Sequence, residues 1–224
     1  MGRFGFEEAD KYGTGGGGSY FSLKDDGDIA RVHILGNDMS DFCGYAVHEV
    51  TVGDKKKWVN CLRKYNEPVD ACPFCASKRM PVRARLFIPL YNIDTQEVQI
   101  WERGKSFFRE LSSYCARNPK VASIVTEIER RGKKGDTQTT YGLYKVEETD
   151  KTLDDFKDDI PEIIGDTYVL DKSADDMEYY LKHGVFPDDG GSSDDEIVRR
   201  RSDRGDRDDR RTPSRRERSN EDVY

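Results

Sequence analysis

The sequence predicts a mainly β fold with a few helices: a small barrel, interrupted by a metal-binding insertion and followed by a charged C-terminal tail. Three observations support this prediction. Short runs of alternating apolar and polar residues recur between turn residues. One histidine and three cysteines have the spacing of metal ligands. Toward the C-terminus, charged and small residues replace the apolar residues that a packed core needs.

The first part of the core is expected to form three strands. Residues 20–23 and 29–35 carry apolar runs, and the Asp- and Gly-rich residues 24–28 between them predict a turn. Residues 45–52 alternate in polarity and form the third expected strand. His48 therefore lies on a strand.

His48 also begins the metal motif. Twelve residues separate it from Cys61, ten residues separate Cys61 from Cys72, and Cys72 and Cys75 form a C-x-x-C. One imidazole nitrogen and three thiolates are the ligand set of a closed, tetrahedral structural zinc site, at Zn–S distances of about 2.3 Å. Because no coordination position remains for water, we expect the zinc to hold shape and to do no chemistry.

The same residues allow two alternatives to this site. A redox C-x-x-C would begin a helix, and Pro68, Pro73 and Pro81 favour zinc because they leave no room for that helix. Cys43 could replace the histidine as the fourth ligand. The odd number of cysteines predicts a reducing compartment, hence a cytoplasmic protein, with Cys43 and Cys115 as small buried residues. No apolar run is long enough to predict a membrane-spanning helix.

The later elements are predicted from the spacing of apolar residues and from the turn-forming residues between segments. In order, we expect a hairpin of residues 82–91 and 97–103, a helix over 105–117, a second helix over 119–131, a strand over 137–146 and a short helix over 175–183. Leu111 and Tyr114 have helical spacing, and Val121 and Ile128 extend the pattern into the second helix.

Charge is segregated along the chain. The net charge is −7, yet residues 54–134 carry 18 basic and 9 acidic residues, whereas residues 135–198 carry 5 basic and 19 acidic residues. This asymmetry indicates a polyanionic partner for the basic middle of the chain and an acidic appendage beside it.

Basic and aromatic residues in the middle of the chain are the candidate contacts for nucleic acid, because cations along a backbone and aromatic rings under bases bind single strands. The candidates are Lys55, Lys56, Lys57, Trp58, Arg63, Lys64, Arg83, Arg85, Tyr91, Trp101, Arg103, Lys105, Lys133, Lys134 and Tyr141. On the expected hairpin, one face should carry Arg83, Arg85, Tyr91, Trp101 and Arg103.

Composition divides the chain into four parts. These are a flexible N-terminal arm (1–19), a core (20–150) that contains the zinc subdomain (about 54–82), an acidic, partly ordered extension (151–186), and a disordered charged tail (187–224).

The metal motif, set in a basic strand-rich core with an acidic C-terminal region, resembles the single-stranded DNA-binding proteins of T-even and other tailed phages. The resemblance covers about residues 20–150 and carries over His48, Cys61, Cys72 and Cys75 as zinc ligands. It implies an OB-fold barrel with an inserted zinc subdomain, and a cleft between them that binds single-stranded DNA without sequence preference. The N-terminal arm lacks the basic cluster that supports cooperative binding in that family, so self-association stays open.

The function implied is binding and protection of single-stranded DNA during phage DNA replication, recombination and repair, in the cytoplasm of an infected bacterium. The acidic C-terminal region would recruit replication and recombination proteins. Two alternatives remain: a zinc-ribbon accessory of a nuclease or primase, and an RNA-binding regulator. We expect no enzymatic activity, because the basic core lacks a carboxylate cluster that would hold Mg²⁺.

Overall fold

The structure, a computed structural model, describes residues 19–136 and 138–187. This part of the chain is mainly β with few helices, as the sequence predicts. Its strands are β1 (Ile29–Ile34), β2 (Gly44–Val52), β3 (Lys55–Asn60), β4 (Val82–Asn92), β5 (Glu97–Gly104), β6 (Ile124–Arg131), β7 (Thr140–Glu148), β8 (Ile164–Gly165) and β9 (Val169–Leu170). Almost all of the expected arm and tail lie outside the described residues.

Within the described residues, three α-helices and several single turns of 3-10 helix lie between the strands or after them. The α-helices are α2 (Pro73–Ser77), α3 (Phe108–Arg117) and α4 (Ala174–His183). The 3-10 turns are η2 (Met39–Asp41), η3 (Val69–Ala71), η4 (Lys105–Phe107), η5 (Val121–Ser123), η6 (Leu153–Asp155) and η7 (Lys157–Asp159). The helices expected over 105–117 and 175–183 are thereby confirmed.

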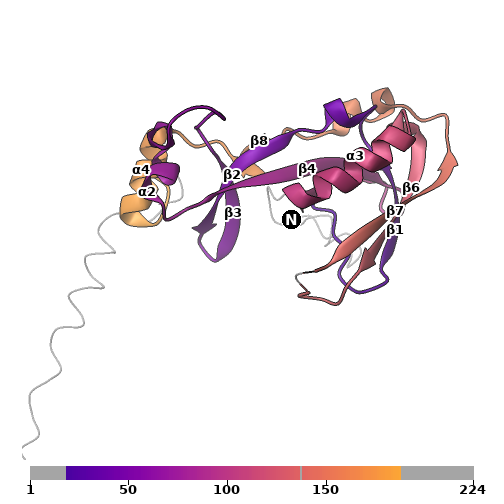
Figure 1. Ribbon diagram of the computed structural model, residues 1–224, viewed down its shortest axis with the longest axis horizontal. Helices are drawn as coiled ribbons and strands as arrows, with labels where there is room; N and C mark the ends of the chain where they lie inside the picture. Colours follow the sequence, from indigo (N-terminus) through magenta and orange to yellow (C-terminus); the bar gives the residue numbers. More distant parts are fainter. Residues whose placement is uncertain (1–18, 137, 188–224) are drawn as a thin grey trace, which may run out of the picture. The chain divides into compact units, whose positions relative to one another are not determined.

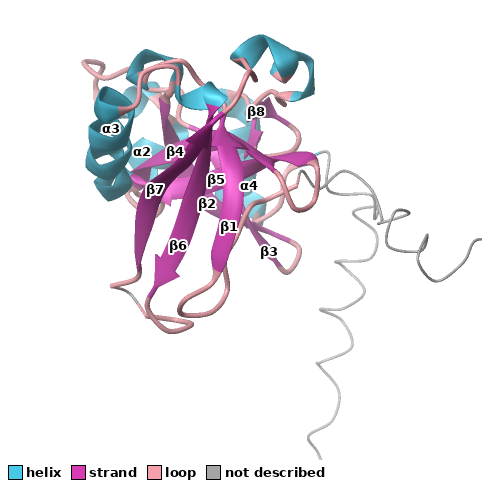
Figure 2. Cartoon of the chain, turned by 90° about the vertical axis from the view of Figure 1, so that its right-hand side faces the viewer, coloured by secondary structure: helices cyan, strands magenta, loops and turns pink. Residues whose placement is uncertain are grey.

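The strands form one open sheet in the order β7-β6-β1-β4-β2-β3-β9-β8, and β5 pairs with β4. Strand β4 is long enough to pair with β2 along its first half and with β1 along its last residues. Figure 2 shows β7, β6 and β1 side by side, with α3 beside them. The hairpin of β2 and β3 leads from this part of the sheet toward α2 and α4 (Figure 1).

The main core lies on one face of the sheet and is centred on Trp101. Apolar residues of β1, β4, β5 and β6 are buried there. Helix α3 packs Leu111 and Tyr114 into the same cluster, and the Tyr114 hydroxyl lies 2.7 Å from the Thr126 hydroxyl of β6. This apolar cluster joins strands that are far apart in the sequence, so it fixes the position of β4 and β5, which line the candidate site.

A second, smaller cluster covers the other face of the sheet. Val47 of β2 and Phe87 of β4 are buried against Tyr168 and Val169. Strand β9 extends the sheet by pairing parallel to β3, with Val169 opposite Trp58. Part of the acidic extension is therefore built into the sheet.

One expected helix is wrong. Residues 119–131 form η5 and strand β6 instead of a helix, and β6 pairs with β1 and β7. The segment is rich in the β-branched residues Ile124, Val125, Thr126 and Ile128, which suit a pleated sheet better than a helix. Residues 20–23 also differ from the expectation, because Tyr20 makes only an isolated bridge with Ile100.

Candidate metal centre and basic cleft

Four side chains from three parts of the chain meet in one cluster. His48 projects from β2, Cys61 follows directly after β3, and Cys72 and Cys75 stand at the start of α2. Their ligand atoms all lie within 4.8 Å of one another, so the cluster could hold a metal ion. The sequence prediction that these four residues come together is confirmed.

Three of the six distances between ligand atoms fit tetrahedral coordination, and all six are at most 4.8 Å. With Zn–S bonds of about 2.3 Å and Zn–N bonds of about 2.0–2.1 Å, a tetrahedral site places sulfurs about 3.8 Å apart and a sulfur about 3.6 Å from the nitrogen. Here the sulfurs of Cys61 and Cys75 are 3.7 Å apart. The His48 Nε2 atom lies 3.5 Å from the sulfur of Cys72 and 3.7 Å from that of Cys75.

The second nitrogen of His48 fixes how the ring faces the cluster. Nδ1 lies 2.8 Å from the carbonyl oxygen of Met80, so Nδ1–H donates to it and Nε2 keeps its lone pair for a metal. Burial lowers the pKa of His48, which favours the neutral imidazole that metals bind.

The three thiols are not equivalent. Burial raises the pKa of Cys61, and burial together with the neighbouring Cys61 raises that of Cys75 to about 12. Burial also acts to raise the pKa of Cys72, but donation from the backbone N–H groups of Cys75 and Leu62 outweighs it and lowers that pKa. Cys72 is thus the thiol that ionises most readily, and the others would rely more on a metal to do so.

The environment of the motif corrects two expectations. A helix does begin at the C-x-x-C, because α2 runs for five residues from Pro73, and proline is well suited to the first turn of a helix. Cys43 is exposed and lies outside the cluster, so it is neither an alternative ligand nor a buried residue. Cys115 is buried as expected.

Helix α4 closes the metal cluster from the C-terminal side. The sulfur of Met177 lies 3.9 Å from that of Cys72, and the rings of Phe74 and Tyr180 meet edge to face at 5.8 Å. Tyr180 also packs on Phe186, and both belong to the same buried cluster as Cys72. Figure 1 shows α2 and α4 side by side.

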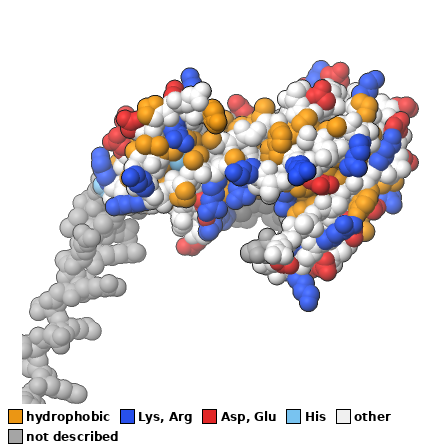
Figure 3. All heavy atoms as spheres, in the orientation of Figure 1, with side chains coloured by type: hydrophobic (Ala, Val, Ile, Leu, Met, Phe, Trp, Pro, Cys, Tyr) orange, Lys and Arg blue, Asp and Glu red, His pale blue; other side chains and the backbone are white. Residues whose placement is uncertain are grey.

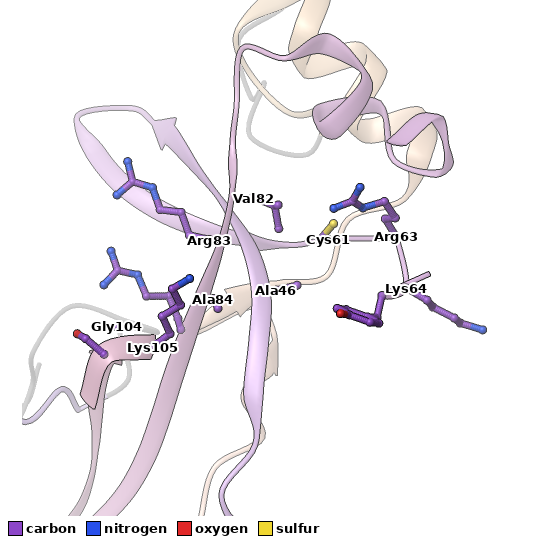
Figure 4. Close-up of a pocket in the computed structure, with 12 residues that line it drawn as sticks. Ala46, Cys61, Arg63, Lys64, Val82, Arg83, Ala84, Gly104 and Lys105 are labelled. Carbon is purple, nitrogen blue, oxygen red and sulfur yellow. The ribbon is translucent and has the colours of Figure 1, made fainter. Parts of the chain in front are cut away.

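A cleft of about 790 Å³ lies beside the metal cluster, and Cys61 belongs to both. Figure 4 shows Ala46 and Ala84, small residues of β2 and β4, on the floor between Arg83 on one side and Arg63 on the other. The basic residues that line the cleft are Arg63, Lys64, Arg83, Arg85 and Lys105. Figure 3 shows Lys and Arg side chains spread across the face of the molecule that is in view.

Both arginines of β4 contact nearby carboxylates. An Arg83 nitrogen lies 3.6 Å from a Glu49 oxygen, and Arg85 lies 3.6 Å from Glu102. Arg85 also stacks over the Trp58 ring, with its guanidinium carbon 4.6 Å from the ring centroid. These contacts orient the two guanidinium groups along the rim while leaving them partly accessible.

Tyr65 is a cleft residue that sequence reasoning missed. It lines the cleft and is 97% exposed, next to Arg63 and Lys64. A ring so exposed on a folded protein loses nothing by stacking on a ligand. The available signal was an aromatic residue directly after two basic ones, but a single tyrosine in a polar loop carries little weight in the sequence.

The remaining candidates fall into separate groups. Lys55, Lys56, Lys57 and Trp58 line a hollow of about 570 Å³ together with Tyr20 and Tyr168. Arg103 and Tyr141 line a smaller hollow of about 290 Å³. Lys133 and Lys134 are exposed in the turn between β6 and β7 and line none of these three cavities.

The expected common face of the β4–β5 hairpin is wrong. Leu86 pairs with Arg103 and Ile88 pairs with Trp101, which places both β5 residues on the face opposite Arg83 and Arg85. Trp101 is fully buried and cannot stack on a base. Tyr91 packs against Phe156, with ring centroids 4.8 Å apart, away from the cleft.

No family model matches the chain, and no curated protein matches it. Within residues 19–136 and 138–187, no helix has the length and apolar character needed to cross a lipid bilayer.

Proposed function

We propose that the protein binds single-stranded DNA without sequence preference, through the cleft beside the metal cluster. The observation that carries this proposal is the lining of the cleft: five basic side chains surround a floor of small residues, and the almost fully exposed Tyr65 stands among them. Basic groups that follow a phosphate backbone, combined with an aromatic platform for bases, grip unpaired strands of any sequence.

The proposed metal is zinc, in a structural role. The donor set of one imidazole and three thiolates is typical of structural zinc, and the sulfur–sulfur and sulfur–nitrogen distances fit its tetrahedral geometry. When bound, the ion would cross-link β2, the end of β3 and α2. His48, Cys61, Cys72 and Cys75 would hold it, and the short loop that carries Arg63, Lys64 and Tyr65 would gain its fixed position from that cross-link.

The proposed core is an OB-type barrel. Five strands follow the order β7-β6-β1-β4-β5, and helix α3 lies between β5 and β6 in the sequence. An OB-fold has the same strand order. In this chain β2, β3 and α2 would be elements inserted into that fold. Across the open side, the ring of Trp101 on β5 packs at 5.2 Å from that of Tyr141 on β7.

Unpaired DNA suits this site better than a duplex does. Proteins that read duplex DNA usually place a basic helix in the major groove. In the described part of the chain, α3 buries Leu111, Tyr114 and Cys115, and α4 is acidic in its first turn. By analogy with the tailed-phage proteins, the role would be to protect single strands in replication, recombination and repair, with replication and recombination proteins as partners of the acidic C-terminal region.

A competition experiment tests the proposal. Fluorescence anisotropy of labelled oligo-dT should show binding that unlabelled single strands of mixed sequence compete for, whereas duplex competes weakly. Affinity should fall steeply with salt, because each neutralised phosphate releases counterions. Equal binding of duplex and single strands would contradict the proposal, and stronger competition by RNA would redirect it to an RNA-binding role.

Two pairs of variants locate the binding in the cleft. Arg83→Ala should weaken binding and reduce the salt slope by about one, whereas Arg31→Ala, a β1 arginine paired with Glu127 outside the cleft, should not. Tyr65→Ala should cost about 1–3 kcal/mol of binding free energy if the ring stacks on a base. Tyr144→Ala, which removes a partly exposed ring from β7, is its control.

A further inference from the structure

The hollow of about 290 Å³ lies next to the cleft, and the two share Gly104 and Ser106 as lining residues. It is formed where β5 ends, η4 begins and β7 starts. A polymeric ligand that binds in the cleft and continues past Gly104 would therefore enter this hollow next.

Arg103 gives the hollow its chemistry. Its guanidinium carbon lies 4.0 Å from the centroid of the Tyr141 ring and 4.7 Å from that of Trp101. Its Nε atom is buried without a hydrogen-bond partner, and none of the ion pairs among the described residues includes Arg103. Burial lowers the pKa of Arg103. Because Nε has no accessible surface, the terminal N–H groups of Arg103 are the donors that can meet an acceptor in the hollow.

The other walls suit a flat polar ring better than a phosphate. Phe107, which is only partly buried, offers an aromatic surface, and Thr140 offers a hydroxyl. Glu110 also lines the hollow, and its carboxylate would repel a phosphate but would accept hydrogen bonds from the N–H groups of a base.

We propose that this hollow is a subsite for one nucleobase of the bound strand, with a carbonyl edge of the base facing Arg103 and the strand crossing β5 at Gly104. This inference rests on the proposed function and deepens it, because it gives the strand a direction from the metal cluster toward β7. It also assigns Arg103 a role different from that of the cleft arginines, namely contact with a base instead of the backbone.

Gly104 leaves the passage open. A Cβ atom built on it would lie 3.5 Å from the Arg85 guanidinium and 3.9 Å from the Ser106 hydroxyl, which is ordinary contact distance. The backbone there is extended, with φ of −74°, so a side chain would be tolerated. Gly104 is one of the two residues that the cleft and the hollow share, and it places no side chain between them.

Thr140→Phe tests the subsite by filling it from its rim. Thr140 is exposed at the first position of β7, and its side chain makes no hydrogen bond among the described residues. Val146→Phe, at another exposed position of the same strand, is the matched control. Arg103→Gln removes the cation while keeping a polar, uncharged side chain, and circular dichroism checks that each variant is folded.

The readout is affinity for oligo-dT lengthened one nucleotide at a time. Wild type and Val146→Phe should gain affinity at the length that first reaches the hollow, by about 5- to 150-fold, as expected for one stacked base. Thr140→Phe and Arg103→Gln should lose this step and bind the shorter oligomers as wild type does.

Trp101 reports on the same event, because the chain has only two tryptophans. In a Trp58→Phe background, the emission of Trp101, which stacks on Arg103, should change only with oligomers long enough to reach the hollow. Adding Thr140→Phe should abolish that change.

If Thr140→Phe and Arg103→Gln keep the affinity step while Arg83→Ala weakens every length, the cleft binds DNA and the hollow is not a subsite. If wild type binds no oligomer at any length, the proposed function itself fails.

Discussion

The strand core around Trp101 and the region around the metal cluster are stabilised in different ways. The core draws apolar side chains from β1, β4, β5, β6 and α3, with the rings of Phe21, Phe107 and Tyr141 packed edge to face on Trp101. The metal region has a smaller buried cluster, and its central helix α2 is only five residues long. A helix of that length is not stable by itself in water.

The metal region therefore needs two supports that the strand core does not need. One is a metal ion, which the four ligand residues could hold and which would join β2, the end of β3 and α2. The other is the segment 174–186, because Met177, Tyr180 and Phe186 supply much of the apolar surface around Cys72. The cleft therefore has one stable wall, on β4 and β5, and one conditional wall, on the loop after Cys61, whose position would depend on these two supports.

The largest effect is expected from removing a metal ligand. Cys72→Ser should abolish stoichiometric metal binding, because structural zinc contributes about 10–16 kcal/mol in small peptides and α2 has little else to order it. Metal analysis and thermal melting should show a protein without zinc whose strand core still melts cooperatively and whose affinity for oligo-dT is lost.

Cys43→Ser is the control, since it removes an exposed thiol outside the cluster. The division into two regions is refuted if Cys72→Ser unfolds the strand core as well. The assignment of the site is refuted if that variant retains one equivalent of metal and full affinity.

The reverse change should damage the core and spare the metal region. Leu111 of α3 is fully buried among the residues around Trp101, so Leu111→Ala should reduce the free energy of unfolding by about 2–5 kcal/mol. Metal stoichiometry at a temperature below the transition should stay that of wild type. Ser113→Ala, on the exposed side of the same helix, should change neither quantity. Loss of metal in folded Leu111→Ala would show that the two regions are not independent.

A smaller effect is expected where α4 is attached to β2. The Tyr180 hydroxyl accepts a hydrogen bond from the Thr51 amide at 3.0 Å and donates to the Thr51 carbonyl at 2.9 Å. Tyr180→Phe leaves both backbone groups without this partner and should cost about 1–3 kcal/mol. Faster transfer of the metal to a coloured chelator measures the loss. Tyr179→Phe, which changes the neighbouring ring in the same way, should transfer metal as wild type does.

Local signals predict the parts of this protein that depend on neighbours in the sequence. The C-x-x-C, the β4–β5 hairpin and the helix over 105–117 all follow from spacing, turn residues or periodicity. The strand over 124–131 does not, because its pattern of apolar residues suits either a helix or a strand, and pairing with β1 decides between them. The positions of Trp101 and Arg103 depend on the register of β5, which the sequence leaves free by one residue.

The role of the acidic extension was hidden by its composition. Residues 151–186 carry many Asp and Glu side chains, yet Tyr168 and Val169 cover the sheet and Met177 closes the metal cluster. A few apolar residues at wide spacing are enough for burial when the surface they cover is already formed. Such contacts lie more than a hundred residues apart in the sequence, as between Cys72 and Met177, so no local pattern indicates them.

The smallest effect is expected from the loss of a helix cap. Two caps can be compared, one beside the metal cluster and one away from it. Ser173 caps α4: its hydroxyl accepts from the Asp176 amide at 3.2 Å, and the Asp176 carboxylate accepts from the Ser173 amide at 3.0 Å. Thr152 caps η6 with the same reciprocal pattern, away from the metal cluster.

Loss of such a cap costs about 1 kcal/mol. Ser173→Ala should therefore speed metal transfer to a chelator by about fivefold, because α4 covers the cluster through Met177. Thr152→Ala should leave the transfer rate unchanged, since η6 contributes nothing to the buried cluster around Cys72. If both variants release metal at the wild-type rate while Ser173→Ala lowers the helix content, then α4 does not hold the metal region together. The conditional wall of the cleft would then depend on the metal alone.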